Sequence, residues 1–578
     1  MRIPSALRGS RRDIPGRRVI VLALLLSLSG GLPLLAQDIS GGANLAKDIE
    51  GGAVGVLLPP VSNRAHNKRS PRQSGPRPVD TLQAQAAARP LKGTPRAGGR
   101  KQVTARERPP RPVATPTVEG FNAQGDDFFD EGQYEKAAQA YKQAIRLKAN
   151  YAQAHNSLGD AYFNLNKYAE AAEAYRQATR LKPDWAEAYD GLGDALFNLG
   201  RDGEALAAYQ QVIRLKPETA ATHYNMGFIY YGMNKYAEAA RSFKEAVRLE
   251  PKDWEAFNRL GQANDRLERY PEAAEAYQQS IRLNRNFPEA HYNLGAALYN
   301  SGRYEEAIAA YREALRLKPD RQDVYNEIGD AYRRLNKFSE AAAAYKQAIL
   351  LKQEDADTYN NLGFVSNKLE RYSDAIEAYK QALRLKPDLQ EAYDNLGFAL
   401  GRIRPPRWNE AIEAFKQALR LKPDDAEAYS NLGWAYNNTG RFAEAADALK
   451  QATRIKPDAA AAHFNLGIAY SRLGTFDAAA EEFRQATRIK PEWAEAYNNL
   501  GYVYGSLRRW NEAIEAHKRA IGLKSDYAGA YFNLGFAYLQ SGNKNGAMEQ
   551  YKVLQSLNPE LAKRLYALIN RPGQRPVA

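Results

Sequence analysis

The chain of 578 residues contains no cysteine. Its absence excludes disulfide frameworks, thiol nucleophiles and cysteine-ligated zinc or iron–sulfur centres. Aromatic residues are missing from the first 120 positions, because all 36 Tyr, 19 Phe and 6 Trp lie from Phe121 onward. Long apolar runs are missing too. The stretch Val19–Leu28 has ten residues, about half of what a membrane-spanning helix needs, so we expect no transmembrane helix in the mature chain.

Charge is distributed as unevenly as the aromatic residues. Residues 1–117 carry 20 Lys and Arg against 6 Asp and Glu, while the remainder carries 61 of each sign. The net charge of +14 therefore belongs entirely to the N-terminal fifth of the chain. A basic leader that lacks aromatic residues precedes a neutral, aromatic-rich body, and the two have to be interpreted separately.

The first 36 residues have the pattern of a secretory signal peptide. Six arginines precede Val19–Leu28, and Leu34-Leu35-Ala36 ends with a small residue. A charged segment, a short apolar segment and a small residue at the cleavage position together favour export, with cleavage after Ala36. Ser10-Arg11-Arg12 leaves twin-arginine export open beside the general route. We expect an exported protein that is periplasmic, associated with the outer envelope or secreted.

Residues 37–117 are rich in Pro, Gly, Ala and Arg and have too little apolar surface to form a core, so we expect a disordered linker. Between Arg64 and Pro112 there are 13 basic and two acidic residues. This segment could contact an anionic surface weakly, or it could be a soluble spacer. Nucleic acid is not expected as a partner, because no aromatic residue is present to stack on bases.

A repeat of 34 residues fills the body of the chain. A glycine recurs thirteen times, with a single 36-residue interval where Arg404–Arg407 adds two residues: Gly125, Gly159, Gly193, Gly227, Gly261, Gly295, Gly329, Gly363, Gly397, Gly433, Gly467, Gly501 and Gly535. With this glycine numbered position 8, positions 4, 7 and 11 are mostly aromatic or Leu, and positions 20, 24 and 27 are mostly Ala, Tyr and Ala. Spacings of three and four are helical, so each repeat should form two helices joined near positions 14–17. Small residues at positions 8 and 20 should let the two helix backbones approach closely.

This pattern resembles the tetratricopeptide repeat family, in which Leu-Gly, aromatic, Ala and Pro residues recur at the same spacing. The resemblance implies an all-α, right-handed superhelical solenoid of thirteen helix pairs over residues 118–558, with the first helix of each pair lining the concave surface. Pro559-Glu560-Leu561 should begin a capping helix over 559–570. A short tail, 571–578, follows.

Nothing in the repeats has the spacing of a catalytic or metal site. Five of the six histidines occupy aromatic positions of the repeat, positions 4 and 24: His155, His223, His291, His463 and His517. They are better explained as packing residues than as bases or ligands. We therefore expect no enzymatic activity, no cofactor and no metal.

Two features mark positions 6 and 9, which should face the concave groove. Position 6 is asparagine in eight repeats: Asn225, Asn293, Asn361, Asn395, Asn431, Asn465, Asn499 and Asn533. An asparagine amide can both donate to and accept from a peptide backbone. The row resembles the asparagine ladder in the repeat domain of O-linked N-acetylglucosamine transferase, whose catalytic domain has no counterpart here. The alternative is that asparagine is simply common at this position.

Position 9 changes character along the chain. It is Asp126, Asp160, Asp194 and Asp330 in four earlier repeats, and it is apolar in the last six: Phe364, Phe398, Trp434, Ile468, Tyr502 and Phe536. Large apolar groups on a solvent-facing stripe favour a binding role centred on Trp434. Packing between neighbouring repeats is the alternative. Basic residues nearby, at positions 12 and 13, could favour acidic ligands: Arg333, Arg334, Lys368, Arg402 and Arg472.

The sequence thus favours a non-enzymatic scaffold, in a bacterial cell envelope, whose C-terminal repeats bind extended segments of partner proteins in the groove. Two other roles stay open. One is a substrate adaptor for a separate glycosyltransferase, suggested by the transferase resemblance. The other is envelope tethering through the basic leader.

Overall fold

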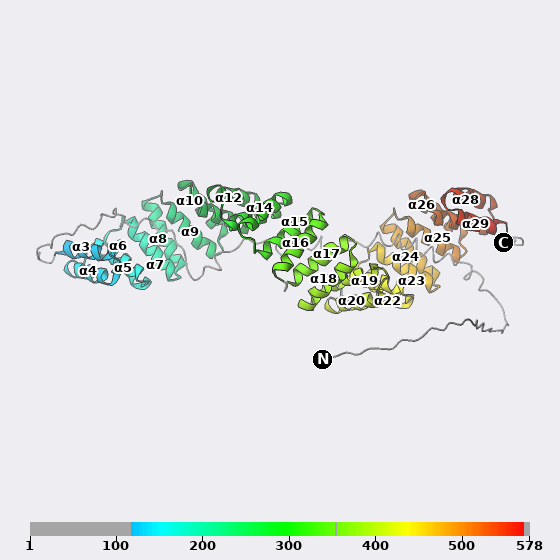
Figure 1. Cartoon of the computed structure of the whole chain (residues 1–578), viewed down its shortest axis with the longest axis horizontal. Helices are drawn as coiled ribbons and strands as arrows, with labels where there is room; N and C mark the ends of the chain where they lie inside the picture. Colours follow the sequence, from blue (N-terminus) through cyan, green and yellow to red (C-terminus); the bar gives the residue numbers. More distant parts are fainter. Residues whose placement is uncertain (1–116, 353–354, 571–578) are drawn as a thin grey trace, which may run out of the picture. The chain divides into compact units, whose positions relative to one another are not determined.

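The structure, a computed structural model, describes residues 117–352 and 355–570, and this part of the chain is all-α (Figure 1). The first helices of the thirteen pairs are α3 (Val118–Asp130), α5 (Ala152–Asn164), α7 (Ala186–Asn198), α9 (Ala220–Gly232), α11 (Trp254–Arg266), α13 (Pro288–Asn300), α15 (Gln322–Arg334), α17 (Ala356–Lys368), α19 (Gln390–Arg402), α21 (Ala426–Asn438), α23 (Ala460–Arg472), α25 (Ala494–Ser506) and α27 (Ala528–Gln540). The predicted signal peptide, the predicted linker up to residue 116 and the C-terminal tail lie outside the described residues.

The second helices follow after short turns. They are α4 (Tyr134–Leu147), α6 (Tyr168–Leu181), α8 (Asp202–Leu215), α10 (Tyr236–Leu249), α12 (Tyr270–Leu283), α14 (Tyr304–Leu317), α16 (Phe338–Leu351), α18 (Tyr372–Leu385), α20 (Trp408–Leu421), α22 (Phe442–Ile455), α24 (Phe476–Ile489), α26 (Trp510–Leu523) and α28 (Lys544–Leu557). A last helix, α29 (Pro559–Ile569), completes the described chain. The predicted all-α solenoid of thirteen helix pairs with a C-terminal cap is confirmed.

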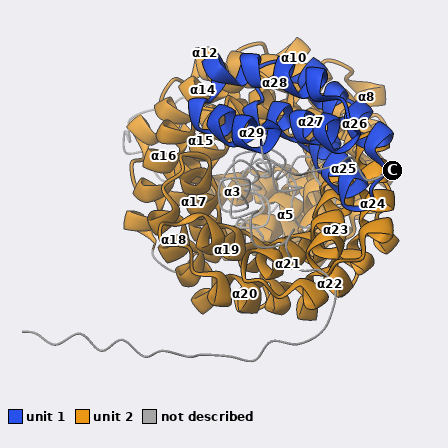
Figure 2. Cartoon of the chain, turned by 90° about the vertical axis from the view of Figure 1, so that its right-hand side faces the viewer, with its two compact units in different colours: residues 1–58, 490–578 blue, residues 59–489 orange. Residues whose placement is uncertain are grey.

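The described chain forms two compact units, residues 117–489 and 490–570 (Figure 2). Within the larger unit each helix packs on its neighbours along the chain, and successive pairs turn around a common axis. First helices such as α17, α19, α21 and α23 lie on the inner side of this path, and their partners α18, α20 and α22 lie on the outer side. The inner surface of the larger unit therefore belongs to the first helices, as the family resemblance implied.

Position 24 supplies the largest buried side chain of most repeats. Tyr175, Tyr209, Tyr345 and Phe415 are fully buried there, and each ring lies directly against the glycine at position 8. A Cβ added to Gly193 would come within 2.6 Å of a ring carbon of Tyr209. The glycine was predicted to let two backbones meet. The structure shows instead that it makes room for an aromatic ring of the second helix.

The turn between the two helices of a repeat is equally regular. Position 15 has a positive φ in twelve repeats, among them Gly200 (φ 74°), Asn336 (φ 57°) and Arg508 (φ 59°). Only glycine adopts this left-handed conformation without cost. The turn nevertheless keeps the same conformation in the repeats where position 15 is Asn, Glu or Arg. The exception is repeat 9, where α19 ends at Arg402 and α20 begins at Trp408. The two extra residues lie in this turn, as predicted.

The capping helix closes the smaller unit. Leu565 of α29 is fully buried and its side chain lies against Gly535, with Cδ2 2.5 Å from where a Cβ would be. Leu554, which stands at position 27 where other repeats have a smaller residue, is fully buried in the same cluster with Ala562 and Ile569. Thus Leu565 lies beside Gly535 where the position 24 side chain of the same repeat lies in the other repeats, and it shields the terminal apolar face.

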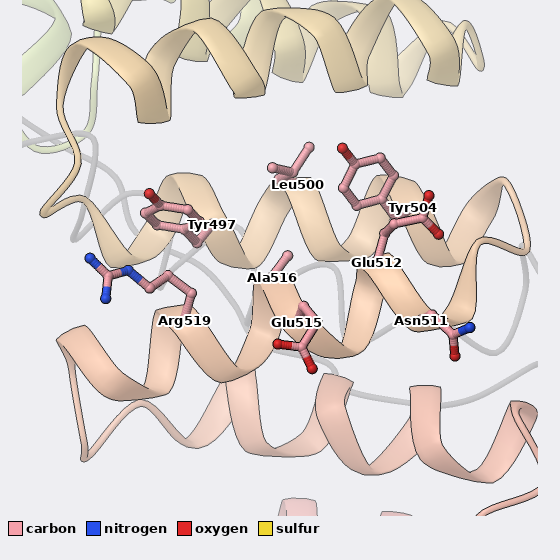
Figure 3. Close-up of a pocket in the computed structure, with 8 residues that line it drawn as sticks. All are labelled: Tyr497, Leu500, Tyr504, Asn511, Glu512, Glu515, Ala516 and Arg519. Carbon is pink, nitrogen blue, oxygen red and sulfur yellow. The ribbon is translucent and has the colours of Figure 1, made fainter.

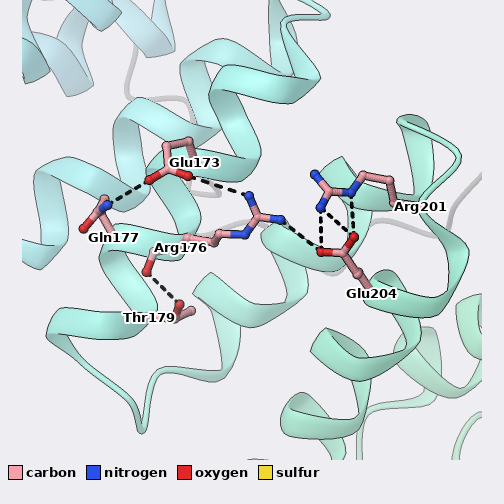
Figure 4. Close-up of polar contacts among 6 residues, drawn as sticks. All are labelled: Glu173, Arg176, Gln177, Thr179, Arg201 and Glu204. Atoms are coloured by element: carbon pink, nitrogen blue, oxygen red, sulfur yellow. Dashed lines mark hydrogen bonds and ion pairs between the residues drawn. The ribbon is translucent and has the colours of Figure 1, made fainter.

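Charged side chains connect helices at the solvent-exposed surface. Arg176 of α6 lies 3.6 Å from Glu173 and 3.2 Å from Glu204 of the next repeat, and Arg201 also pairs with Glu204 (Figure 4). All of these side chains are at least 28% exposed, so each pair contributes little to stability, about 0–1 kcal/mol. Among the described helices, none is both long enough and apolar enough to cross a membrane.

The glycine–ring contact predicts unequal effects of two glycine substitutions in repeat 3. Gly193→Ala places a methyl group into the Tyr209 ring and should destabilise α7 and α8 by about 1–3 kcal/mol. Gly203→Ala, in α8, meets no atom within 4 Å and should be neutral or stabilise by up to about 1 kcal/mol. Hydrogen exchange of both helices compares the two variants. Equal protection in both would contradict the proposed role of the ring contact.

Candidate protein-binding surface

The asparagines at position 6 do not form one continuous open row. Asn225 and Asn293 are at most 1% exposed. In the smaller unit, Asn499 donates to the carbonyl of Glu495 (2.8 Å) and Asn533 donates to Asn498 (3.1 Å). Four consecutive repeats differ: the amides of Asn361, Asn395, Asn431 and Asn465 are partly exposed and bond to no other described side chain or backbone group. An open ladder is thus confined to repeats 8–11.

Aspartate at position 9 has a structural partner inside its own repeat. Asp126, Asp160, Asp194 and Asp330 each accept a hydrogen bond from the tyrosine hydroxyl at position 24, over 2.8, 2.7, 2.6 and 2.7 Å. A tyrosine buried against the glycine needs an acceptor for its hydroxyl, and position 9 supplies it. These aspartates are therefore part of the repeat's core as well as of its inner surface.

The same pairing explains much of the change to apolar residues. In repeats 9, 10 and 11, position 24 has no hydroxyl, since it is Phe415, Leu449 and Phe483. No acceptor is needed there, and position 9 is Phe398, Trp434 and Ile468. In repeat 8 the Tyr379 hydroxyl accepts from Asn367 (3.2 Å) instead, which leaves Phe364 at position 9. Comparing positions 9 and 24 within the sequence would have revealed this dependence.

Trp434, predicted as the centre of the binding stripe, is not solvent-facing. It is 8% exposed, and its ring lies 4.7 Å from Trp408 of the preceding repeat in an edge-to-face arrangement. Gly401 is close to both indoles. This corrects the prediction of an exposed Trp434. The alternative, packing between neighbouring repeats, holds for this residue.

Phe398 and Phe536 combine packing with some exposure. The ring centre of Phe398 lies 6.4 Å from that of Tyr372 in the preceding repeat. In the smaller unit the ring centres of Phe536 and Trp510 are the same distance apart. Both phenylalanines are nevertheless partly exposed, as are Phe364, Ile468 and Tyr502. The inner face therefore keeps apolar surface at position 9 in repeats 8, 9 and 11 of the larger unit.

Two of the basic residues next to position 9 stack on its aromatic rings. Lys368 lies 5.5 Å from the centre of the Phe364 ring and Arg402 lies 5.7 Å from that of Phe398, one helical turn along in each case. Partial burial lowers the pKa of Lys368. Neither cation pairs with a carboxylate among the described residues, whereas Arg333 pairs with Asp330 (3.0 Å). Arg334 donates to the Tyr299 hydroxyl (3.3 Å), and Arg472 is exposed.

The histidines have structural roles. Nε2 of His155, His291 and His463 lies 2.9–3.0 Å from a backbone carbonyl in the turn before its helix. His517, at position 24, is 2% exposed, and burial lowers its pKa to about 3. The described residues contain no group of three His, Asp or Glu that could hold a metal ion. The rings of His155, His291, His463 and His517 therefore make structural contacts within the solenoid, and the absence of a catalytic or ligand role stays a prediction.

A shallow depression of about 420 Å³ lies on the smaller unit, against α25 and α26 (Figure 3). Tyr497, Leu500 and Tyr504 line it, at positions 4, 7 and 11. Position 11 carries packing between repeats elsewhere, since Lys142 of repeat 1 lies 5.2 Å from the ring of Tyr162 in repeat 2. The depression is thus built from packing positions, and we assign no ligand to it.

Burial of Trp434 predicts a structural effect of its removal. Trp434→Ala should destabilise α19–α22 by about 3–5 kcal/mol, because it opens a cavity beside Trp408. Phe364→Ala, at the same repeat position but partly exposed, should cost only about 1–2 kcal/mol. Local hydrogen exchange in the two variants measures the difference. An equally small loss of stability in both variants would show that packing of the Trp434 ring does not stabilise the repeats.

Glu427 predicts an unusual pH dependence. Its burial, together with nearby Asp425, raises its pKa to about 7, so the folded state binds this proton more tightly than the unfolded state does. Its contribution makes the free energy of unfolding fall as pH rises from about 5 to about 8. Glu427→Gln should match the wild type in melting temperature at about pH 4, below the ordinary pKa of a glutamate, and exceed it at about pH 8, whereas Glu413→Gln, on an exposed outer side chain, should not gain over the wild type in this way. A constant difference across this pH range would exclude the effect.

Models of the repeat match most of the body. The model described as TPR repeat matches residues 125–166, 159–200, 193–234, 329–369 and 506–542. Models described as Tetratricopeptide repeat match residues 224–286, 265–321, 407–460, 438–492, 356–389 and 528–561. Together these segments cover more than half of the chain. No curated protein matches.

Solved structures of other repeat proteins are similar to parts of the chain. The crystal structure of the APC/C hetero-tetramer Cut9–Hcn1 is 17% identical, with 79% of this chain and 97% of that chain covered and a TM-score of 0.36. YrrB, described as a TPR protein with an unusual peptide-binding site, is 27% identical over 33% of this chain and 96% of its own, with a TM-score of 0.30. MamA is 27% identical over 28% and 95%, with a TM-score of 0.27.

The repeat models, the thirteen helix pairs and the capping helix agree. Repeats of this kind are typically non-catalytic scaffolds with protein partners. The chain belongs to the tetratricopeptide repeat family.

Proposed function

We propose that this chain is a non-enzymatic scaffold that binds extended segments of partner proteins along the inner face of repeats 7–11. The observation that carries the proposal is the open ladder of Asn361, Asn395, Asn431 and Asn465, whose amides lack partners in the described part of the chain. Each amide offers one acceptor and two donors, which suits the backbone of an extended peptide. Four successive repeats offer this at a regular spacing.

The neighbouring side chains indicate the chemistry of the bound segment. Phe364 and Phe398 supply partly exposed rings, and Lys368 and Arg402 lie over those rings without a carboxylate partner among the described residues. A partly desolvated cation gains more from a carboxylate than a fully hydrated cation does. We therefore expect partner segments that combine acidic with apolar residues.

Export to a bacterial envelope is part of this proposal. Its support is the N-terminal sequence pattern alone, with cleavage expected after Ala36. N-terminal sequencing of the protein recovered from cell fractions would check both the cleavage site and the compartment. The adaptor role and the tethering role remain predictions without a supporting contact in the described helices.

A peptide selection tests the proposed groove. The chain is exposed to a library of 12-residue peptides, and binding of the enriched peptides is measured by fluorescence anisotropy. We expect acidic and apolar residues to be enriched, and Lys368→Glu with Arg402→Glu to weaken binding at least tenfold, since both cations would become repulsive. Asn395→Ala with Asn431→Ala should weaken it as well.

The matched control reverses two charges on the outer helices of repeats 7 and 8. Lys346 and Lys380 are exposed at position 25, so Lys346→Glu with Lys380→Glu makes the same change in net charge outside the groove. Peptide binding by this outer variant should equal that of the parent chain. If the inner and outer variants weaken binding equally, net charge and not the groove accounts for recognition.

A further inference from the structure

The inner face of the first three repeats carries charge of only one sign. Positions 1, 2, 5, 6, 9, 12 and 13 of α3, α5 and α7 contain no Lys or Arg, and their acidic residues are Glu119, Asp126, Asp130, Asp160, Glu187, Asp190 and Asp194. The equivalent positions of repeats 7–11 include Arg333, Lys368 and Arg402. Glu187 contacts Lys216, and Asp190 and Asp194 are buried. The inner surface is therefore acidic chiefly in repeats 1 and 2, and it contains cations farther along.

One of these acidic groups in each of repeats 1–3 stands beside a phenylalanine, an arrangement called here an acidic step. Asp126 and Phe129 stand one helical turn apart, and Asp160 and Phe163 repeat the arrangement in the next repeat. A tyrosine hydroxyl holds each carboxylate in place, over 2.8 Å and 2.7 Å. Each ring is braced edge-to-face, Phe129 on Tyr134 at 5.2 Å and Phe163 on Tyr168 at 5.3 Å. Asp194 and Phe197 continue the series in repeat 3, where both are buried.

A carboxylate beside an aromatic ring suits one side chain above all. The planar guanidinium of arginine can donate two hydrogen bonds to a carboxylate and stack on a ring with the same group. Crowding supports this assignment: Asp130 and Asp127 add to the burial that raises the pKa of Asp126, so a cation there would relieve repulsion. Repeats 1 and 2 thus share a carboxylate–ring geometry that suits arginine.

An unsatisfied acceptor lies in the same place. Asn122 is 6% exposed and donates its Nδ2 to Asp126 over 3.1 Å, but its Oδ1 has no donor among the described residues. In repeat 2, Asn156 makes the same bond to Asp160 and leaves its Oδ1 equally without a donor. Buried acceptors are normally paired. Both oxygens therefore point to a ligand that brings N–H donors.

The chain itself contains a segment with the matching chemistry. Residues 96–111 hold Arg96, Arg100, Lys101, Arg106, Arg108 and Arg111 with a single acidic residue, Glu107. They end six residues before Thr117, which caps α3 through its side chain. An extended chain advances about 3.3 Å per residue, so this segment can reach α3 and α5 without a long linker. Its attachment to the same chain gives it a high effective concentration.

We propose that the arginine-rich segment 96–111 binds in cis to the acidic inner face of repeats 1–3, with guanidinium groups on the Asp126/Phe129 and Asp160/Phe163 steps. An external ligand would then reach these repeats only by displacing the segment. Repeats 7–11 would remain open to partners. The inference concerns different residues from the proposed function and does not rest on it.

The absence of cysteine allows a direct test on the whole chain with its leader. Ala105→Cys places one thiol in the segment. A second thiol is placed on the inner face by Asn164→Cys, or on the outer helix α6 by Glu170→Cys, both exposed positions at similar distances along the chain. A short bismaleimide should join the inner pair at least ten times faster than the outer pair. Because the attraction is electrostatic, 0.5 M NaCl should remove most of the difference.

Charge removal identifies the partner of the segment. Asp126→Asn with Asp160→Asn keeps an acceptor for each tyrosine but removes both charges, and should lower the inner rate to the outer rate. Asp184→Asn with Asp388→Asn, on exposed turns, should leave it high, and circular dichroism confirms that all variants fold. Equal inner and outer rates in the parent chain, or an inner rate unaffected by Asp126→Asn with Asp160→Asn, would overturn the proposal. So would a cross-linked product of dimeric mass, which would assign the segment to a second copy.

The same assay separates this inference from the proposed function. Lys368→Glu with Arg402→Glu lies in repeats 8 and 9 and should leave the cross-linking rate unchanged. A loss of peptide binding in that variant with unchanged cross-linking would support the groove of repeats 7–11 independently of the cis interaction.

Discussion

The contact between the glycine at position 8 and the side chain at position 24 fixes the geometry of the helix pair in repeats 1–12, and in repeat 13 Leu565 of the capping helix takes the place of position 24. No larger residue fits at position 8, since a Cβ there would lie 2.3–2.8 Å from the facing side chain in all thirteen repeats. The contact lies within one repeat and needs no help from distant parts of the chain. Twelve copies of it, with the Leu565 contact in repeat 13, produce thirteen similar pairs, and the stack follows from packing each pair on the next.

This contact also determines part of the inner surface. In repeats 1, 2, 3, 5 and 7 the buried tyrosine hydroxyl at position 24 donates to an aspartate at position 9 or 12 of the first helix, as Tyr209 does to Asp194 and Tyr277 to Asp265. Repeat 6 is an exception, because the Tyr311 hydroxyl has no partner among the described residues. When position 24 lacks a hydroxyl, position 9 is free to be apolar. A residue on the inner surface can therefore be selected by the core beneath it, so its presence there does not by itself identify a binding site.

That coupling explains which predictions from sequence succeeded. Period and composition predicted the helix pairs, the turn with its insertion and the cap, because each depends on contacts between residues close in sequence. The role of position 9 depended on a contact across the pair and on the preceding repeat. Sequence periodicity places Trp434 on the inner helix, but only the packing of Trp408 and Gly401 around it shows that the indole is buried. The asparagine ladder likewise appears uniform in sequence and is open in only four repeats.

Residues that take no part in the contact between positions 8 and 24 are the ones that can determine which partner binds. The amides of Asn395 and Asn431 and the cations of Lys368 and Arg402 contribute nothing to the glycine–ring contact, so they can differ between repeats without changing the fold. The acidic steps of repeats 1 and 2 are a mixed case, because Asp126 and Asp160 both accept a hydrogen bond from a tyrosine and place a carboxylate on the first helix. Tyrosine needs only an acceptor, which asparagine would provide equally well. Aspartate adds a negative charge that the hydrogen bond does not require. The proposed binding of the positively charged segment before α3 would account for that charge.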